Sequence, residues 1–110
     1  MNSICIVDQF GNKKWFNSKG DFHREDGPAC EYTNGNKYWY INGKKHRINL
    51  PAIEWASGSR FWYQNGELHR EDGPAEEYFD GEKHWYINGE EIYCKDNEEF
   101  LRIIKLKFFL

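Results

Sequence analysis

The sequence predicts a mainly β fold, an antiparallel meander of stacked 23-residue β-hairpin repeats followed by a short C-terminal helix. Three observations support this prediction. A short motif recurs at a fixed spacing, Asn-Gly pairs follow strand-like runs, and aromatic residues make up 18% of the 110 residues. Repeats of this length usually form supersecondary units that bury an apolar face only by stacking on one another.

The repeat is defined by a Gly-x-x-His-Arg motif, in which x is any residue. It occurs as GDFHR (20–24), GKKHR (43–47) and GELHR (66–70), and GEEIY (89–93) continues the series without His-Arg. A tryptophan precedes each motif, at positions 15, 39, 62 and 85, and Pro-Ala pairs begin at 28, 51 and 74. We therefore place three full units and a fragment, called units 1 to 4, in residues 10–93 of a single domain covering residues 1–110.

Each unit is expected to contain two short strands. The first is an aromatic run such as NKYWYI (36–41), which ends at Asn-Gly, a strong hairpin signal because both turn positions prefer positive φ. The second carries His-Arg, passes a proline and leads into ACEY, AIEW or AEEY. Proline lacks the N–H that a sheet interior needs, so a bend or edge is expected there. Turns at TNG, ASG and FDG then start the next unit.

Alternation along the first strand assigns side chains to two faces. Trp39 and Ile41 share one face, and Tyr38 and Tyr40 share the other. Stacking is therefore expected to produce a tryptophan ladder on one face. The other face receives a ladder of Phe16, Tyr40, Tyr63 and Tyr86. This second ladder is the best binding candidate, because tyrosine combines a large contact area with few rotatable bonds and a polar tip.

The C-terminal segment, residues 96–110, is expected to form the helix. Asp96 and Asn97 are possible N-caps, and Glu98 and Glu99 suit the positive helix end. One apolar stripe contains Phe100, Leu101, Ile104 and Phe108, and a second contains Ile103, Leu106 and Leu110. A strand, in which apolar residues alternate with lysines 105 and 107, is the competing interpretation. Two apolar faces imply that one contacts the sheet and the other contacts a second subunit or a target.

The His-Arg and acidic residues are expected to be structural. His23, His46 and His69 would lie ~10 Å apart, too far to share one metal, so each should pack by a tryptophan or bond the turn backbone. Glu-Asp pairs at 25–26 and 71–72 recur with the repeat, whereas a catalytic pair is needed once. We expect them to pair with arginines of neighbouring repeats. No catalytic residue, metal ligand or cofactor is predicted, and the protein is not expected to be an enzyme.

Unit 2 departs from the pattern, since RINLPAIEW (47–55) replaces the acidic loop. Its apolar residues are Ile48, Leu50, Ile53 and Trp55. They could fill the interior of the array or form an exposed patch for a partner.

Composition excludes several classes of protein. The net charge of −3 argues against binding of long nucleic acids, and no apolar run is long enough to span a bilayer. The three cysteines have unrelated spacings, so no disulfide framework is expected. MNSICIVDQF has no cationic start or cleavage site typical of a signal peptide, and a cytoplasmic protein is expected.

The pattern W-x-x-N-G-x-x-H in 23-residue units resembles the MORN repeat family. The resemblance rests on Trp39, Asn42, Gly43 and His46 and on their counterparts in units 1 and 3. The family's usual His-Gly is His-Arg here, and Asp-Gly-Pro-Ala is added, which is closer to the HREDGPA-type repeats of small bacterial, phage and giant-virus proteins. The resemblance implies stacked hairpins, dimerisation and protein or lipid-headgroup binding without catalytic residues.

These observations together predict a non-enzymatic protein-interaction module. A phage- or virus-type inhibitor or adaptor that binds a host protein in the host cytoplasm would suit the resemblance, with a possible homodimer through the C-terminal helix. The candidate partner-binding residues are Tyr40, Tyr63, Tyr86, Ile48, Leu50, Trp55, Phe100, Ile104 and Phe108. The alternative is a protein that binds a nucleotide or phosphorylated headgroup through Arg24, Arg47, Arg70 and Tyr63.

Overall fold

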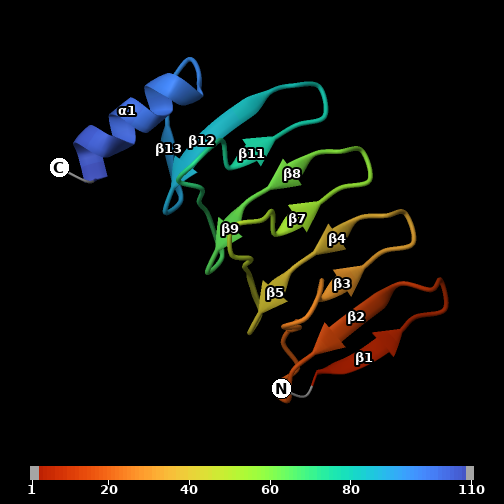
Figure 1. Ribbon diagram of the computed structural model, residues 1–110. Coiled ribbons are helices and arrows are strands. Elements are labelled where there is room, and N and C mark those ends of the chain that lie inside the picture. The colour runs from red at the N-terminus through yellow and green to blue at the C-terminus, as the bar shows by residue number, and fades with distance from the viewer. Residues whose placement is uncertain (1–2, 109–110) are drawn as a thin grey trace.

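The computed structural model describes residues 3–108 and contains one long antiparallel sheet (Figure 1). Nine strands lie in the order β1-β2-β3-β4-β7-β8-β11-β12-β13. Their bounds are Ile4–Val7 (β1), Lys13–Phe16 (β2), Cys30–Glu31 (β3), Lys37–Tyr38 (β4), Ile53–Glu54 (β7), Arg60–Phe61 (β8), Glu76–Glu77 (β11), Lys83–Ile87 (β12) and Glu90–Ile92 (β13). The molecule measures 48 × 30 × 17 Å, so most of the sheet is a single layer. The predicted mainly β meander is confirmed, and β1 is an additional strand that the sequence did not predict.

The aromatic run of unit 2 divides at its tryptophan instead of forming one strand as predicted. Its second half, β5 (Tyr40–Ile41), pairs with β6 (Lys44–Lys45) in a separate two-stranded sheet. Unit 3 repeats this arrangement with β9 (Tyr63–Gln64) and β10 (Glu67–Leu68). The Trp39 N–H donates to the Ala52 carbonyl at 2.7 Å, and the Trp39 carbonyl accepts from the His46 N–H at 3.1 Å. The run therefore changes partners at Trp39, because residues 46–52 leave the sheet as a loop.

The Asn-Gly turns form as predicted in units 2 to 4. Asn42 and Gly43 have φ of 49° and 81°, and the Asn65-Gly66 pair has φ of 51° and 86°. Positive φ at both positions matches the right-handed twist of the flanking strands, and asparagine and glycine are the residues that tolerate it.

Opposite charges alternate across the tryptophan side of the sheet, which is the face that carries Trp15, Trp39, Trp62 and Trp85. We call this row of residues the charge ladder, and the strand registers place its consecutive members directly opposite one another. Its members are Lys13, Glu31, Lys37, Glu54, Arg60, Glu77 and Lys83. Cross-strand pairs of opposite charge contribute roughly 0.2–1 kcal/mol each. A one-residue slip would move a strand's charge to the other face, so the ladder also fixes the register.

Histidines join consecutive units through the turn backbone. The Asn42 N–H donates to Nδ1 of His23 at 2.9 Å, and the Asn88 N–H donates to Nδ1 of His69 at 2.9 Å. His46 accepts the equivalent bond from the Asn65 N–H at 3.0 Å. An accepting Nδ1 places the proton on Nε2. The prediction that the histidines bond the turn backbone is confirmed.

The arginines lie flat on the tryptophans of their own units. The Arg24 guanidinium carbon is 3.8 Å from the ring centre of Trp15, and the Arg70 carbon is 3.9 Å from that of Trp62. Arg24 also binds Asp26 at 3.0 Å and Glu31 at 3.0 Å. The predicted pairing between neighbouring repeats is therefore wrong. Stacking on the unit's own tryptophan directs each guanidinium to acids of the same unit.

The C-terminal helix, α1 (Asn97–Phe108), covers the tryptophan side at unit 4. Asp96 is its N-cap, since its Oδ1 accepts from the Glu99 N–H at 2.9 Å, and the strand interpretation is wrong. Phe100 and Ile104 are 0% and 4% exposed against Trp85, Ile87 and Ile92.

The burial of Phe100 and Ile104 corrects their predicted role as partner contacts. They belong to the chain's own core, because unit 4 has Tyr93 in place of the stacking arginine and its tryptophan needs another cover. Leu106 and Phe108 are exposed, and Leu110 lies outside the described residues.

Candidate interaction surfaces

An unbroken row of rings crosses the sheet face opposite the tryptophan side that carries Trp15, Trp39, Trp62 and Trp85. We call it the aromatic row, and its members are Tyr32, Tyr38, Trp55, Phe61, Tyr78 and His84. They lie in or directly after β3, β4, β7, β8, β11 and β12, so the row spans six consecutive strands of the sheet. Consecutive members touch edge to face or share a hydrogen bond, and α1 packs on the other face of the sheet, against Trp85.

Trp55 is the centre of the aromatic row. Its ring centre lies 4.8 Å from that of Phe61, and its Nε1–H donates to the Tyr38 hydroxyl at 3.1 Å. Trp55 is 39% exposed, whereas Phe61 beneath it is 5% exposed. The buried Phe61 ring thus supports the exposed Trp55 indole and holds it in one orientation.

The predicted ladder of Tyr40, Tyr63 and Tyr86 is present on the same face but is not continuous. Tyr40 packs on Phe22 at 5.2 Å between ring centres, and the Lys45 ammonium lies 4.9 Å from the ring centre of Tyr63. Burial raises the pKa of all three phenols, that of Tyr86 to about 12, with Glu76 and Glu91 adding to the shift of Tyr86. These hydroxyls are therefore protonated donors at neutral pH.

The sequence interpretation placed Tyr38 on the face opposite Trp39, but it did not single out Tyr38 or the equivalent residues of units 3 and 4, Phe61 and His84, as a binding surface. A signal was present, since positions 38, 61 and 84 and positions 32, 55 and 78 each recur every 23 residues. Their contact depends on the pairing of β3 with β4 and of β7 with β8, which the repeat alone does not supply.

The two ends of the aromatic row differ in charge. The Lys14 ammonium lies 5.7 Å from the ring centre of Tyr32 at one end. At the other end, His84 lies between Glu82 at 2.6 Å and Glu91 at 3.1 Å. The hydrogen bond to Glu82 raises the pKa of His84, and Glu91 acts in the same direction against the effect of partial burial. Burial also raises the pKa of Glu76, and the nearby Glu91 and Glu82 add to this shift.

The contacts of His84 are expected to stabilise the fold most on the acidic side of neutrality. A raised folded-state pKa means that the folded protein holds the proton more tightly than the unfolded chain. This stabilisation is present below the unfolded-state pKa of 6.5 and is lost as pH rises through the folded-state pKa. We expect the thermal midpoint of wild type to exceed that of His84→Gln by a margin that narrows between about pH 6 and pH 8. A margin that widens with pH would contradict this assignment.

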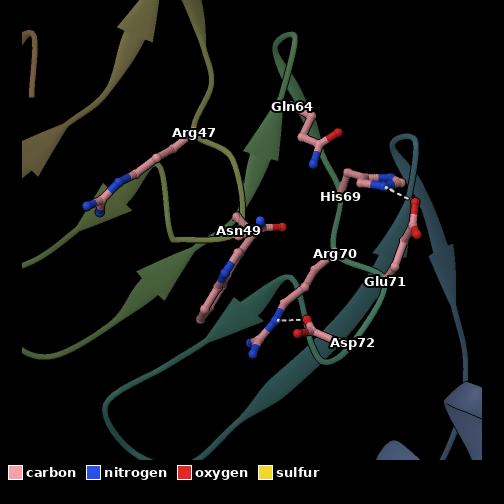
Figure 2. A pocket seen from close by; sticks show the side chains of 8 residues that line it. Arg47, Asn49, Gln64, His69, Arg70, Glu71 and Asp72 are labelled. Carbon is pink, nitrogen blue, oxygen red and sulfur yellow. Dashed lines mark hydrogen bonds and ion pairs between the residues drawn. The ribbon is translucent and has the colours of Figure 1, made fainter. Parts of the chain in front are cut away.

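The arginines of the alternative ligand site already have partners. The hollow between units 2 and 3 has a volume of ≈ 250 Å³, and Figure 2 shows its lining side chains. Arg70 binds Asp72 at 2.8 Å and His69 binds Glu71 at 3.0 Å, while Arg47 points away from them. In units 1 to 3 the arginine Nη1 also donates to a proline carbonyl and a glutamate. An anionic ligand would have to displace these contacts, which weakens the case for Arg24, Arg47 and Arg70 as ligand-binding residues.

The irregular apolar residues of unit 2 separate in the structure. Ile53 is buried in the sheet, whereas Ile48 is 67% exposed beside a hollow of ≈ 380 Å³ that Trp39 and Ile41 also line. Leu50 and Trp55 line a different hollow of ≈ 460 Å³. Ile53 therefore fits the interior interpretation, whereas Ile48, Leu50 and Trp55 are exposed, and their role toward a partner stays a prediction.

Within residues 3–108, no group of three or more His, Cys, Asp or Glu side chains could hold a metal ion. No described helix combines the length and apolar character that a membrane crossing requires. Comparison of the chain with protein-family models, with curated proteins and with solved structures finds no significant match.

Proposed function

We propose that this chain is a non-enzymatic protein-interaction module that binds its partner through the aromatic row. The observation that supports this proposal is the continuity of the row over six strands on the sheet face opposite α1. Rings held in place by their neighbours lose little conformational freedom on binding, so they contribute contact area at a low entropic cost. The resemblance to HREDGPA-type repeats points to the same class, a small adaptor or inhibitor.

Trp55 is the anchor of the proposed interface. Interface hot spots are enriched in tryptophan and lie within a ring of less critical contacts. Trp55 is a partly exposed tryptophan held in place by Tyr38 and Phe61, which suits it to such a role. The charge difference between the Lys14 end and the Glu82–Glu91 end would orient the partner along the row.

The same proposal includes self-association through α1. Its outer side keeps apolar residues exposed after Phe100 and Ile104 are buried. A small adaptor with two such faces can hold a partner on the aromatic row and a second subunit on the helix.

The aromatic-row proposal predicts that Trp55→Ala weakens partner binding roughly tenfold or more. The partner would be isolated from source cells on immobilised wild-type protein, identified by mass spectrometry, and titrated by calorimetry against each variant. Tyr93→Ala is the matched control, because Tyr93 is an exposed aromatic residue outside the row. Thermal melts would verify that both variants fold. Equal affinities of wild type and Trp55→Ala would refute the assignment.

A further inference from the structure

The first strand of the sheet, β1, differs from the strands that follow it. Of the nine strands that form the sheet in residues 3–108, β1 is the one that contains no charged residue. It is an edge strand, because it pairs with β2 alone (Figure 1). Ile4, Ile6 and Val7 are 64%, 57% and 56% exposed. Proteins usually protect such an edge with charges, proline, a bulge or a covering element, so β1 is an unprotected edge.

The opposite edge of the sheet is protected. Its strand, β13, carries Glu90 and Glu91, and Lys107 of α1 binds Glu90 at 2.6 Å. The helix also packs against Ile92 of this strand. The absence of charge in β1 is therefore a specific feature of one end of the sheet.

The hydrogen bonds of β2 show which backbone groups of β1 are free to pair. The Trp15 N–H donates to the Ala29 carbonyl at 2.8 Å, so the backbone groups of Trp15 point away from β1. Cys5 lies opposite Trp15, and both residues of such an antiparallel pair direct their N–H and C=O groups outward. Val7 has the same orientation as Cys5, whereas Ile6 between them bonds to β2. The outer edge thus presents the N–H and C=O groups of Cys5 and Val7, and no other described strand pairs with them.

This edge is complementary to itself. Two β1 strands can lie antiparallel with Ile6 opposite Ile6 of the second copy, which places Cys5 of each copy opposite Val7 of the other. Every free N–H and C=O group of both residues is then paired. A register shifted by two residues leaves some of these groups without a partner. A charged strand in the same two-fold arrangement would bring like charges together, and β1 has none.

Both faces of such a junction are apolar. Ile6 pairs with Lys14, whose ammonium lies at the end of the aromatic row, so Ile6 is on the side of that row. Cys5 pairs with Trp15, so Cys5 and Val7 are on the tryptophan side. Pairing therefore brings isoleucine against isoleucine on one face and cysteine against valine on the other. Apolar surface is removed from water on both faces.

We propose that two copies of this chain pair through β1, antiparallel and centred on Ile6, so that their sheets join into one continuous sheet. A two-fold axis perpendicular to the sheet relates the copies and keeps both aromatic rows on the same face. If the aromatic row binds the partner as proposed above, the pair presents two binding rows to a partner with repeated sites. The junction is separate from the self-association proposed through α1, because β1 and β13 are opposite edges of the sheet.

Disulfide formation tests the register. The two Ile6 residues form a non-hydrogen-bonded pair, whose Cα atoms are about 4.5 Å apart, within the range that a disulfide spans. Ile4 lies opposite Asp8 of the second copy, so the two Ile4 residues are about 13 Å apart along the strands. In a Cys5→Ser background, we therefore expect Ile6→Cys but not Ile4→Cys to form an interchain disulfide on mild oxidation, measured by non-reducing electrophoresis. Equal cross-linking of the two variants overturns the proposal.

Charge substitution at Ile6 tests the two-fold arrangement in solution. Ile6→Lys and Ile6→Glu each place like charges opposite one another and remove the isoleucine contact, so each should raise the dimer dissociation constant roughly tenfold. Mixing the two variants should restore dimers, because lysine then faces glutamate. Ile4→Lys is the matched control on the same face, and it should dimerise at least as well as the unsubstituted strand because it lies opposite Asp8 of the second copy.

Sedimentation across a concentration series measures these dissociation constants. Every protein in the series carries Leu106→Glu, at an exposed residue of α1, so that association through the helix does not contribute. Thermal melts verify that each variant folds. Dimers that persist equally in all Ile6 variants overturn the β1 junction. A protein that stays monomeric and does not cross-link through Ile6→Cys also overturns it, and leaves the proposals for α1 and for the aromatic row as they stand.

Discussion

Phe100→Ala is expected to lower the free energy of unfolding by about 3–5 kcal/mol and to release α1 from the sheet. Phe100 is 0% exposed and its ring centre lies 6.3 Å from that of Trp85, in the core cluster that joins the helix to unit 4. Truncation leaves a cavity in the centre of the cluster that holds α1 on the sheet. Chemical denaturation followed by circular dichroism would measure the loss, with the helical signal disappearing first.

The neighbouring residue supplies the control for this prediction. Leu101→Ala removes apolar volume from the same helix turn, but Leu101 is 44% exposed. We expect Leu101→Ala to cost less than about 1 kcal/mol. Equal losses for the two variants would show that α1 is not held by the Phe100 side.

Gly73→Leu is expected to lower the free energy of unfolding by about 2 kcal/mol. A Cβ at this position would lie 2.8 Å from the guanidinium carbon of Arg70. That group cannot simply move away, because it stacks on Trp62 at 3.9 Å and binds Asp72 and Glu77. The substitution therefore disrupts the stacked arginine as well as the loop.

Unit 2 shows how the chain accommodates a leucine at this position. Leu50 replaces the glycine there, the preceding Asn49 has φ of 64°, and Arg47 still lies 3.9 Å from the ring centre of Trp39. Asparagine adopts this left-handed conformation more readily than most other residues, so it permits a different path for the loop. We expect Asp72→Asn combined with Gly73→Leu to recover at least half of the lost stability in the same denaturation assay. A double variant no more stable than Gly73→Leu, with Asp72→Asn alone as control, would contradict this explanation.

The features that were predicted correctly from sequence depend on local chemistry. The Asn-Gly turns follow from the φ preferences of two adjacent residues, and α1 follows from the Asp96 cap and the acidic first turn. The histidine contacts were anticipated because a recurring histidine beside a hairpin turn has a nearby backbone donor. The mainly β class then follows from repetition of these local signals.

The features that were missed depend on how the loops fold back. Pro51 predicted a bend or an edge, but nothing local shows that the whole of residues 46–52 leaves the sheet, so the division of the strand at Trp39 could not be derived. The stacking of each arginine on its own tryptophan is a consequence of that loop. For this reason the arginines pair with acids of their own unit and not with acids of neighbouring units, as had been predicted. The strand β1 carries neither the repeat motif nor an Asn-Gly turn, and so gave no signal.

The charge ladder and the histidine contacts make the boundaries between units chemically equivalent. Units 2 and 3 each bring one cation and one anion in the same order, Lys37 with Glu54 and Arg60 with Glu77. The histidine of each of units 1 to 3 also accepts a bond from the turn of the unit that follows it. A whole unit could therefore be inserted or deleted without leaving a mismatched charge or an unpaired turn N–H, changing the length by about 10 Å, two strand spacings. The array is modular, and its reach is adjustable in steps of one unit.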